Sequence, residues 1–195
     1  MRRIESLKKQ VAELYESRNP ARADWSDWMY ENHIFVVADN AQKFAGQYGA
    51  DAELVVAAAL LHDVADAVMK RENQNHEHQS NLIAHRLLQE SGFSEEEIQI
   101  VIEDAIRFHG CKEGQNPKTV EGKVMATADA VAHLSTNFYD YAIKALKEAN
   151  EPIEEIKGWG LPKIERDYHS KIFFEEVRRN MKGDYDRVKV LFESL

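Results

Sequence analysis

Cysteine, proline and glycine are scarce in this 195-residue sequence, which has one, four and nine of them respectively. The single cysteine, Cys111, excludes an internal disulfide framework. Little proline or glycine, and hardly any alternation of apolar with polar residues, argue against β-structure and predict an all-α fold. Long hydrophobic runs are also missing, because the longest, residues 54–61, is too short to span a membrane.

Basic residues are outnumbered, with 25 Lys and Arg against 34 Asp and Glu and a formal net charge of −9. This charge repels nucleic-acid backbones and anionic membranes, so we expect neither extended nucleic acid nor a membrane as a partner. A basic beginning followed by an amphipathic segment, with no apolar signal core, predicts a cytoplasmic protein. An acidic protein that handles a small anion needs local positive potential, which a bound divalent cation supplies.

Apolar residues recur at helical spacing through most of the chain, and the hydrophobic content of 44% is enough for one globular core. Asp51 is a predicted N-cap for the helix that carries residues 54–61, and Gly49 ends the helix before it. Ser94 and Glu97 have the spacing of a capping box. The other clear helices are predicted at residues 26–48, 119–134, 137–149 and 162–181.

We predict a single domain over residues 1–195, with a core at about residues 26–135 and a C-terminal helical extension at about residues 136–195. Residues 158–162, with two glycines and a proline, predict a break between helices. Gly183 predicts the end of the long helix after that break. An amphipathic helix is also expected before Pro20.

Histidines and aspartates stand on or at the end of helices that are otherwise apolar. Residues 54–61 have no polar side chain, so they predict a fully buried helix that delivers His62 and Asp63 from the core. A buried, unpaired carboxylate costs several kcal/mol, and a divalent cation compensates its charge and accepts an imidazole nitrogen. Taken singly, His33 and Asp129 are more often structural residues than ligands. Their combination with the His-Asp doublet favours a metal site.

Four segments in order carry a family resemblance: AALLHDVAD at residues 58–66, HEHQSNLIAHRLLQESG at 76–92, VIEDAIRFHG at 101–110 and TVEGKVMATADA at 119–130. Together with His33 they resemble the HD-domain superfamily of metal-dependent phosphohydrolases. The resemblance covers roughly residues 33–134. It implies a compact multi-helix HD-domain bundle, with extra flanking helices at both ends.

The resemblance also implies roles for individual residues. The implied metal ligands are His33, His62, Asp63 and Asp129. Two imidazoles and two carboxylates suit one or two ions of Mn²⁺, Mg²⁺, Fe²⁺, Co²⁺ or Ni²⁺. Such an ion would activate water and neutralise charge on a phosphoryl group.

Further positions are less specific. Asp66 is the implied catalytic residue that orients or deprotonates the water, with a solvated helix-end carboxylate as the alternative. His78 and His109 correspond to places where relatives hold a second metal or contact substrate phosphate. His76 competes with His78, and we prefer His78 because of its His-x-Ser spacing to Ser80.

Among the cations near these segments, Lys112 and Lys123 are the preferred residues for binding a substrate phosphate. The alternative for both is a lysine that solvates the surface or pairs with a carboxylate.

The sequence departs from the family pattern in two places. Val36 stands where many members have an arginine, and Ala130 and Val131 replace an Arg-Leu pair of nucleotide-cleaving relatives. The leading hypothesis is hydrolysis of a phosphate ester or anhydride of a small phosphorylated metabolite, with a nucleotide favoured, by a nucleotidase or a nucleotide pyrophosphohydrolase. The alternatives are a di-iron HD-like oxygenase and a non-catalytic, metal-stabilised signalling module. Whether the chain forms a homodimer is left open.

Overall fold

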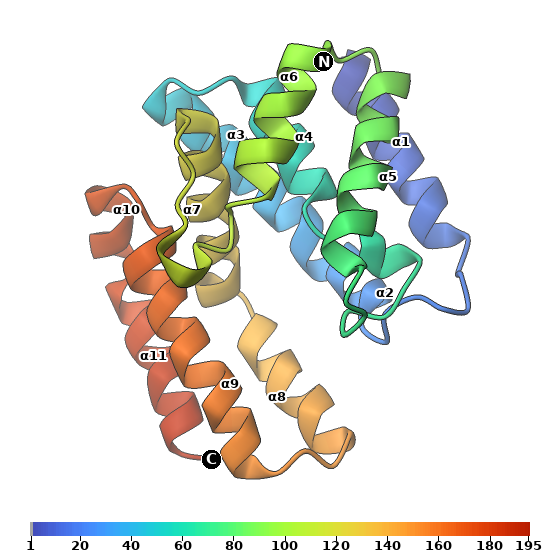
Figure 1. Cartoon of the computed structure of the whole chain (residues 1–195). Helices are drawn as coiled ribbons and strands as arrows, with labels where there is room; N and C mark the ends of the chain where they lie inside the picture. The colour runs from blue at the N-terminus through green and yellow to red at the C-terminus, as the bar shows by residue number, and fades with distance from the viewer. Residues whose placement is uncertain (1) are drawn as a thin grey trace.

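The computed structural model describes residues 2–195, which form helices and connections without any β-strand (Figure 1). This confirms the predicted all-α class. The helical elements are α1 (Arg2–Glu16), α2 (Ser26–Met29), η1 (Tyr30–Ile34), α3 (Phe35–Tyr48), α4 (Ala52–Leu61), η2 (Val64–Ala67), α5 (His76–Glu90), α6 (Glu95–Gln99), η3 (Ile100–Ile106), η4 (Lys112–Gly114), α7 (Val120–Ser135), α8 (Phe138–Glu148), α9 (Ile153–Arg166), η5 (Asp167–Lys171), α10 (Glu175–Asn180) and α11 (Lys182–Glu193). None of these helices has the length and apolar character needed to cross a membrane.

The predicted helix ends are confirmed where side chains satisfy the free backbone groups. The Asp51 carboxylate accepts hydrogen bonds from the backbone N–H groups of Glu53 and Leu54 at 2.8 and 3.2 Å. Ser94 and Glu97 form the predicted capping box. Gly49 ends α3 in the left-handed conformation, with a φ of +74° that suits glycine. These local signals fix where α3, α4 and α6 stop or start.

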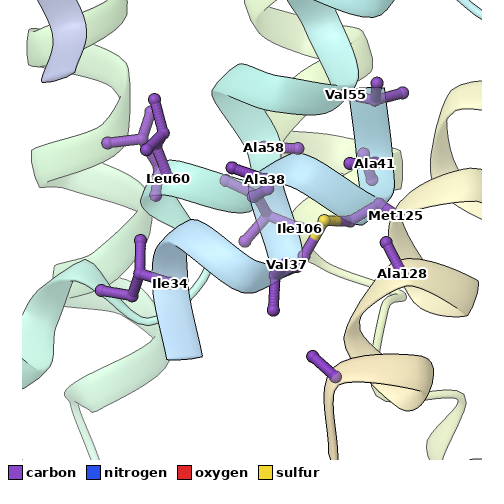
Figure 2. Packing of buried hydrophobic residues seen from close by; sticks show 14 of the residues in the cluster. Ile34, Val37, Ala38, Ala41, Val55, Ala58, Leu60, Ile106, Met125 and Ala128 are labelled. Atoms are coloured by element: carbon purple, nitrogen blue, oxygen red, sulfur yellow. The ribbon is translucent and has the colours of Figure 1, made fainter. Parts of the chain in front are cut away.

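The core is centred on α4, which packs against α3 and α7. Every residue from 54 to 61 is buried, as the unbroken apolar run predicted. Small side chains such as Ala38, Ala41 and Ala58 lie at the crossing of these helices, between Val37, Val55 and Met125 (Figure 2). This close packing holds the end of α4 rigidly beside α3 and α7.

The C-terminal extension corrects three predictions. α9 runs from Ile153 to Arg166 without a break at residues 158–162, and Gly183 lies in the first turn of α11. A Cβ on Gly160 would lie 1.8 Å from Cε1 of Phe192, so this glycine permits close packing of α9 on α11. Tertiary packing therefore overrides the local preference of glycine and Pro162 to end a helix. The predicted helix at residues 162–181 is instead interrupted after η5, where Ile172 and Phe174 have extended backbone angles.

Three helical segments, η1, η3 and η5, have the wider π-helical turn. π-helical turns occur often at functional sites, because the extra residue reorients the side chains that follow. Here His33 lies within η1, His109 follows η3 and Lys171 ends η5. The helices α8, α9 and α11 lie on one side of α7, away from α1 and α5 (Figure 1).

Candidate metal centre

Three of the four predicted metal ligands meet in the interior of the protein. His33 comes from η1, His62 directly follows α4, and Asp129 lies in the middle of α7. One ligand atom of each lies within 4.8 Å of those of the other two, and all three residues are buried. The packing of α3, α4 and α7 thus brings together residues that are far apart in the sequence.

The orientation of His62 is fixed by the helix that delivers it. Its Nδ1 lies 2.8 Å from the carbonyl oxygen of Ala59. Because a carbonyl only accepts, Nδ1 carries the proton and Nε2 has a free lone pair. Nε2 lies 3.5 Å from Oδ2 of Asp63 and 3.9 Å from Oδ1 of Asp129, and it is buried without a hydrogen-bond partner. A lone pair that faces two carboxylate oxygens is stabilised when a cation lies between them.

His33 adds a second imidazole, and neither of its nitrogens has a hydrogen-bond partner among residues 2–195. It is 1% exposed, and neither ring nitrogen makes a hydrogen bond within the described part of the chain. Its Nε2 lies 3.1 Å from Oδ1 of Asp129. Burial lowers the pKa of His33, so the ring is neutral near pH 7 and offers a lone pair. A neutral imidazole is the form that binds metal.

Asp129 uses its two oxygens differently. Oδ2 accepts a short hydrogen bond from the Lys171 ammonium group, whereas Oδ1 is buried with no hydrogen bond. Burial would raise the pKa of Asp129, but the imidazole of His133 and the ammonium of Lys171 outweigh burial and hold it well below its ordinary value. The carboxylate is therefore ionised, and its Oδ1 faces His33 and His62.

The donor set fits a divalent cation. Two imidazole nitrogens and a carboxylate oxygen suit a borderline or hard ion, and each has a buried lone pair that no protein group satisfies. Unsatisfied buried polar atoms cost about 1–3 kcal/mol each, so three of them at one point need an explanation. A bound ion would satisfy all three.

Asp63, the fourth predicted ligand, lies at the edge of this group. Its Oδ2 accepts a 2.7 Å hydrogen bond from Arg71, and its side chain is 17% exposed. Burial would raise the pKa of Asp63, but Arg71 and nearby histidines hold it well below the usual range. Arg71 also donates to both oxygens of Asp66 and lies over the ring of Trp25.

Asp66 is completely buried and accepts from Arg71 and from Nε2 of His76, 2.8 Å away. It does not line the cavity above the metal centre, and its predicted catalytic role stays a prediction.

That cavity has a volume of about 610 Å³, and Asp63, His62, His109 and Asp129 lie in its wall. Nδ1 of His109 lies 2.5 Å from the carbonyl oxygen of Ile106, which leaves Nε2 as the acceptor, as in His62. Burial lowers the pKa of His109 to about 4. His109 thus lines the cavity, and its predicted role in binding a second metal or a substrate stays a prediction.

The other predicted site residues differ in their positions. Lys112 lines the cavity, whereas Lys123 on α7 does not. His78 is exposed and outside the cavity wall, whereas His76, the competing candidate, lies in the wall and contacts Asp66. His76 and His78 lie within the same turn of α5 but on different faces of the helix, and the His-x-Ser spacing did not distinguish them.

Sequence reasoning missed a buried network from the C-terminal half. His133, four residues after Asp129, lies 3.4 Å from its Oδ1 through Nε2 and 3.1 Å from Oδ2 of Asp167 through Nδ1. Asp167 also pairs with Lys163 at 3.0 Å and Lys171 at 3.3 Å. The i, i+4 spacing of Lys163, Asp167 and Lys171 was a signal, but the same spacing is common on exposed helices.

Comparison with known proteins adds one finding. No curated protein and no solved structure matches the chain. The family model for the HD domain matches residues 30–134, which include His33, His62, Asp63 and Asp129. The match covers more than half of the chain. The protein therefore belongs to the HD domain family.

Proposed function

We propose that this protein is a metal-dependent phosphohydrolase that cleaves a phosphate ester or anhydride of a small phosphorylated metabolite, and that its substrate is a nucleotide. HD domain proteins are generally metal-dependent phosphohydrolases. The observation that carries the proposal is the group of buried, unsatisfied ligand atoms of His33, His62 and Asp129, with His62 and Asp129 in the wall of a cavity.

The divalent cation would be held by His33, His62, Asp63 and Asp129. Its identity is one of Mn²⁺, Mg²⁺, Fe²⁺, Co²⁺ and Ni²⁺. Such an ion, when bound, activates water near neutral pH and offsets negative charge on a phosphoryl group. Around it, Lys171 holds Asp129 ionised and oriented, and Arg71 fixes Asp63. Asp66 would act on the reaction indirectly, by orienting Arg71 and His76, because these are the side chains that bond to its carboxylate.

The cavity favours a nucleotide-sized substrate. Its volume of about 610 Å³ falls within the usual range of small-molecule sites, roughly 300–1,000 Å³. Trp25, Phe108 and Trp159 contribute aromatic surface to its wall, on which a base could stack. Cationic side chains in the same wall suit phosphate oxygens.

The test is an assay of the metal-stripped protein against a panel of nucleotides, with and without added Mn²⁺. We expect Mn²⁺-dependent release of phosphate or pyrophosphate from at least one of them, and loss of both metal content and turnover in Asp63→Ala. Asp39→Ala, which removes an exposed carboxylate from α3, is the matched control and should behave like the wild type. Turnover of no nucleotide, or an Asp63→Ala variant with unchanged metal content and rate, would contradict the proposal.

The di-iron alternative needs both His78 and His109 as ligands, and the exposed position of His78 gives it no support. The non-catalytic alternative does not explain why the ligand group adjoins a cavity whose wall includes Lys163, Arg166 and Lys171.

A further inference from the structure

One wall of the cavity comes from the C-terminal extension, outside the residues that match the HD domain. We call Lys163, Arg166 and Lys171, which lie in α9 and η5 and line the cavity, the cationic wall. Three cationic side chains of an acidic chain thus lie in one wall of the cavity.

Most cations that line the cavity are already neutralised. Arg71 pairs with Asp63 and Asp66, and Arg107 pairs with Glu103 at 2.8 Å. Lys163 pairs with Asp167, and Lys171 pairs with Asp129 and Asp167. These ion pairs position side chains around the metal centre, and they leave little positive charge available to an anionic ligand.

Arg166 is different. Among the described residues, no carboxylate lies within ion-pair distance of its guanidinium group, and its Nε is buried without a hydrogen-bond acceptor. A buried donor of a charged group without an acceptor is costly. An anionic ligand in the cavity would offset the charge of this guanidinium group, which no carboxylate pairs with.

Arg166 lines the same cavity as the loop that follows η3. Cys111, in this loop, lines the cavity together with Arg166. Lys112, the next residue, also lines the cavity and has no carboxylate partner among residues 2–195. The loop is held by Asp104, which accepts from the backbone N–H groups of Lys118 and Thr119 at 2.8 and 2.9 Å.

We propose that Arg166, with Lys112 as a second cation, binds a phosphate group of the substrate other than the one at the metal centre. The inference rests on the proposed function and narrows its substrate class to molecules with at least two phosphate groups. Asp63 and Asp129 bond to Arg71 and Lys171 and not to Arg166, so the guanidinium group of Arg166 is not used to position the metal centre and remains available for a second phosphate group. A guanidinium group binds phosphate oxygens in pairs, which gives it an advantage over lysine at this position.

The test is isothermal titration of metal-free protein, in chelator, with inorganic pyrophosphate and with orthophosphate. We expect the wild type to bind pyrophosphate more tightly than orthophosphate. Arg166→Gln should weaken pyrophosphate binding by at least about tenfold and remove its advantage over orthophosphate, and Arg166→Lys should fall between the two. Arg179→Gln changes the net charge equally but lies on the exposed face of α10, so it should bind like the wild type.

Unfolding curves of all variants separate a loss of binding from a loss of folding, and the charge-retaining Arg166→Lys serves if Arg166→Gln is unstable. Equal pyrophosphate affinity in the wild type and the Arg166 variants would overturn the inference, as would a wild type that does not prefer pyrophosphate. Arg166-dependent pyrophosphate binding in a protein that hydrolyses no nucleotide would support the anion site and refute the proposed function.

Discussion

The two sides of the cavity are built on opposite principles. On the HD side, His33 and His62 present lone pairs to the buried Oδ1 of Asp129, and no protein group satisfies them. On the C-terminal side, Lys163 and Lys171 bring positive charge that is paired with Asp167 and Asp129. The HD side has unsatisfied acceptor atoms, whereas the C-terminal side contributes the cationic groups. The comparison teaches that Asp129, which belongs to the HD domain, is kept ionised in part by Lys171, which lies in a C-terminal segment without a recognisable motif.

The strongest test of the HD side is Asp129→Asn. Loss of the carboxylate charge should reduce metal content to background and turnover by at least about a thousandfold, because a catalytic ion contributes several kcal/mol. It also leaves Lys171 with Asp167 alone. Metal analysis and the nucleotide assay measure the effect, with Asp39→Asn as control. A variant that retains stoichiometric metal would show that Asp129 is not a ligand.

Lys171→Met tests whether the two sides compensate each other. Removing one partner of a buried ion pair costs about 3–5 kcal/mol, since Asp129 and Asp167 lose a shared cation. A divalent cation at the metal centre offsets the charge of Asp129 again. Thermal unfolding should therefore show a larger Mn²⁺-induced rise in Tm for Lys171→Met than for the wild type or the surface control Lys144→Met. Equal rises would mean that Lys171 and the metal act independently.

Gly160→Ala tests the packing that places the C-terminal side. A methyl group at this position overlaps the ring of Phe192 and should destabilise the protein by about 1–3 kcal/mol. Gly46→Ala, where nothing lies within 4 Å of the added carbon, is the matched control and should be neutral or slightly stabilising. Urea unfolding measures both variants. An unchanged stability in Gly160→Ala would mean that α9 and α11 can separate without cost.

The smallest expected effect is a pH dependence of the metal-free protein. Burial lowers the pKa of His109 to about 4 and that of His133 to about 3, from an ordinary value of 6.5. Below about pH 6.5 the unfolded chain binds protons that the folded protein does not, so stability falls as pH decreases. The slope is at most about 1.4 kcal/mol per pH unit for each histidine.

Urea unfolding between about pH 7 and pH 5 measures this slope. His133→Gln should reduce it, whereas the exposed His85→Gln should leave it unchanged. A slope that is identical in all three proteins would show that His133 is not held neutral by burial.

Much of the HD side could be predicted from the sequence. The caps at Asp51 and Ser94 act through hydrogen bonds to residues two or three positions away, so the local sequence is enough to predict them. The apolar run before His62 predicted a buried helix because burial on every face requires an apolar residue at every position. Family order then predicted that His33 and Asp129 would approach His62.

The sequence by itself therefore determined the helices of the core and named three residues, His33, His62 and Asp129, that meet at the candidate metal centre. Only the tertiary structure decided that α9 continues through Gly160 and Pro162, that His76 faces inward where His78 does not, and that Lys171 holds Asp129. Those outcomes depend on contacts between segments far apart in the chain, such as Gly160 with Phe192 and Asp129 with Lys171. Their energies outweigh local preferences, and no neighbouring residue signals them.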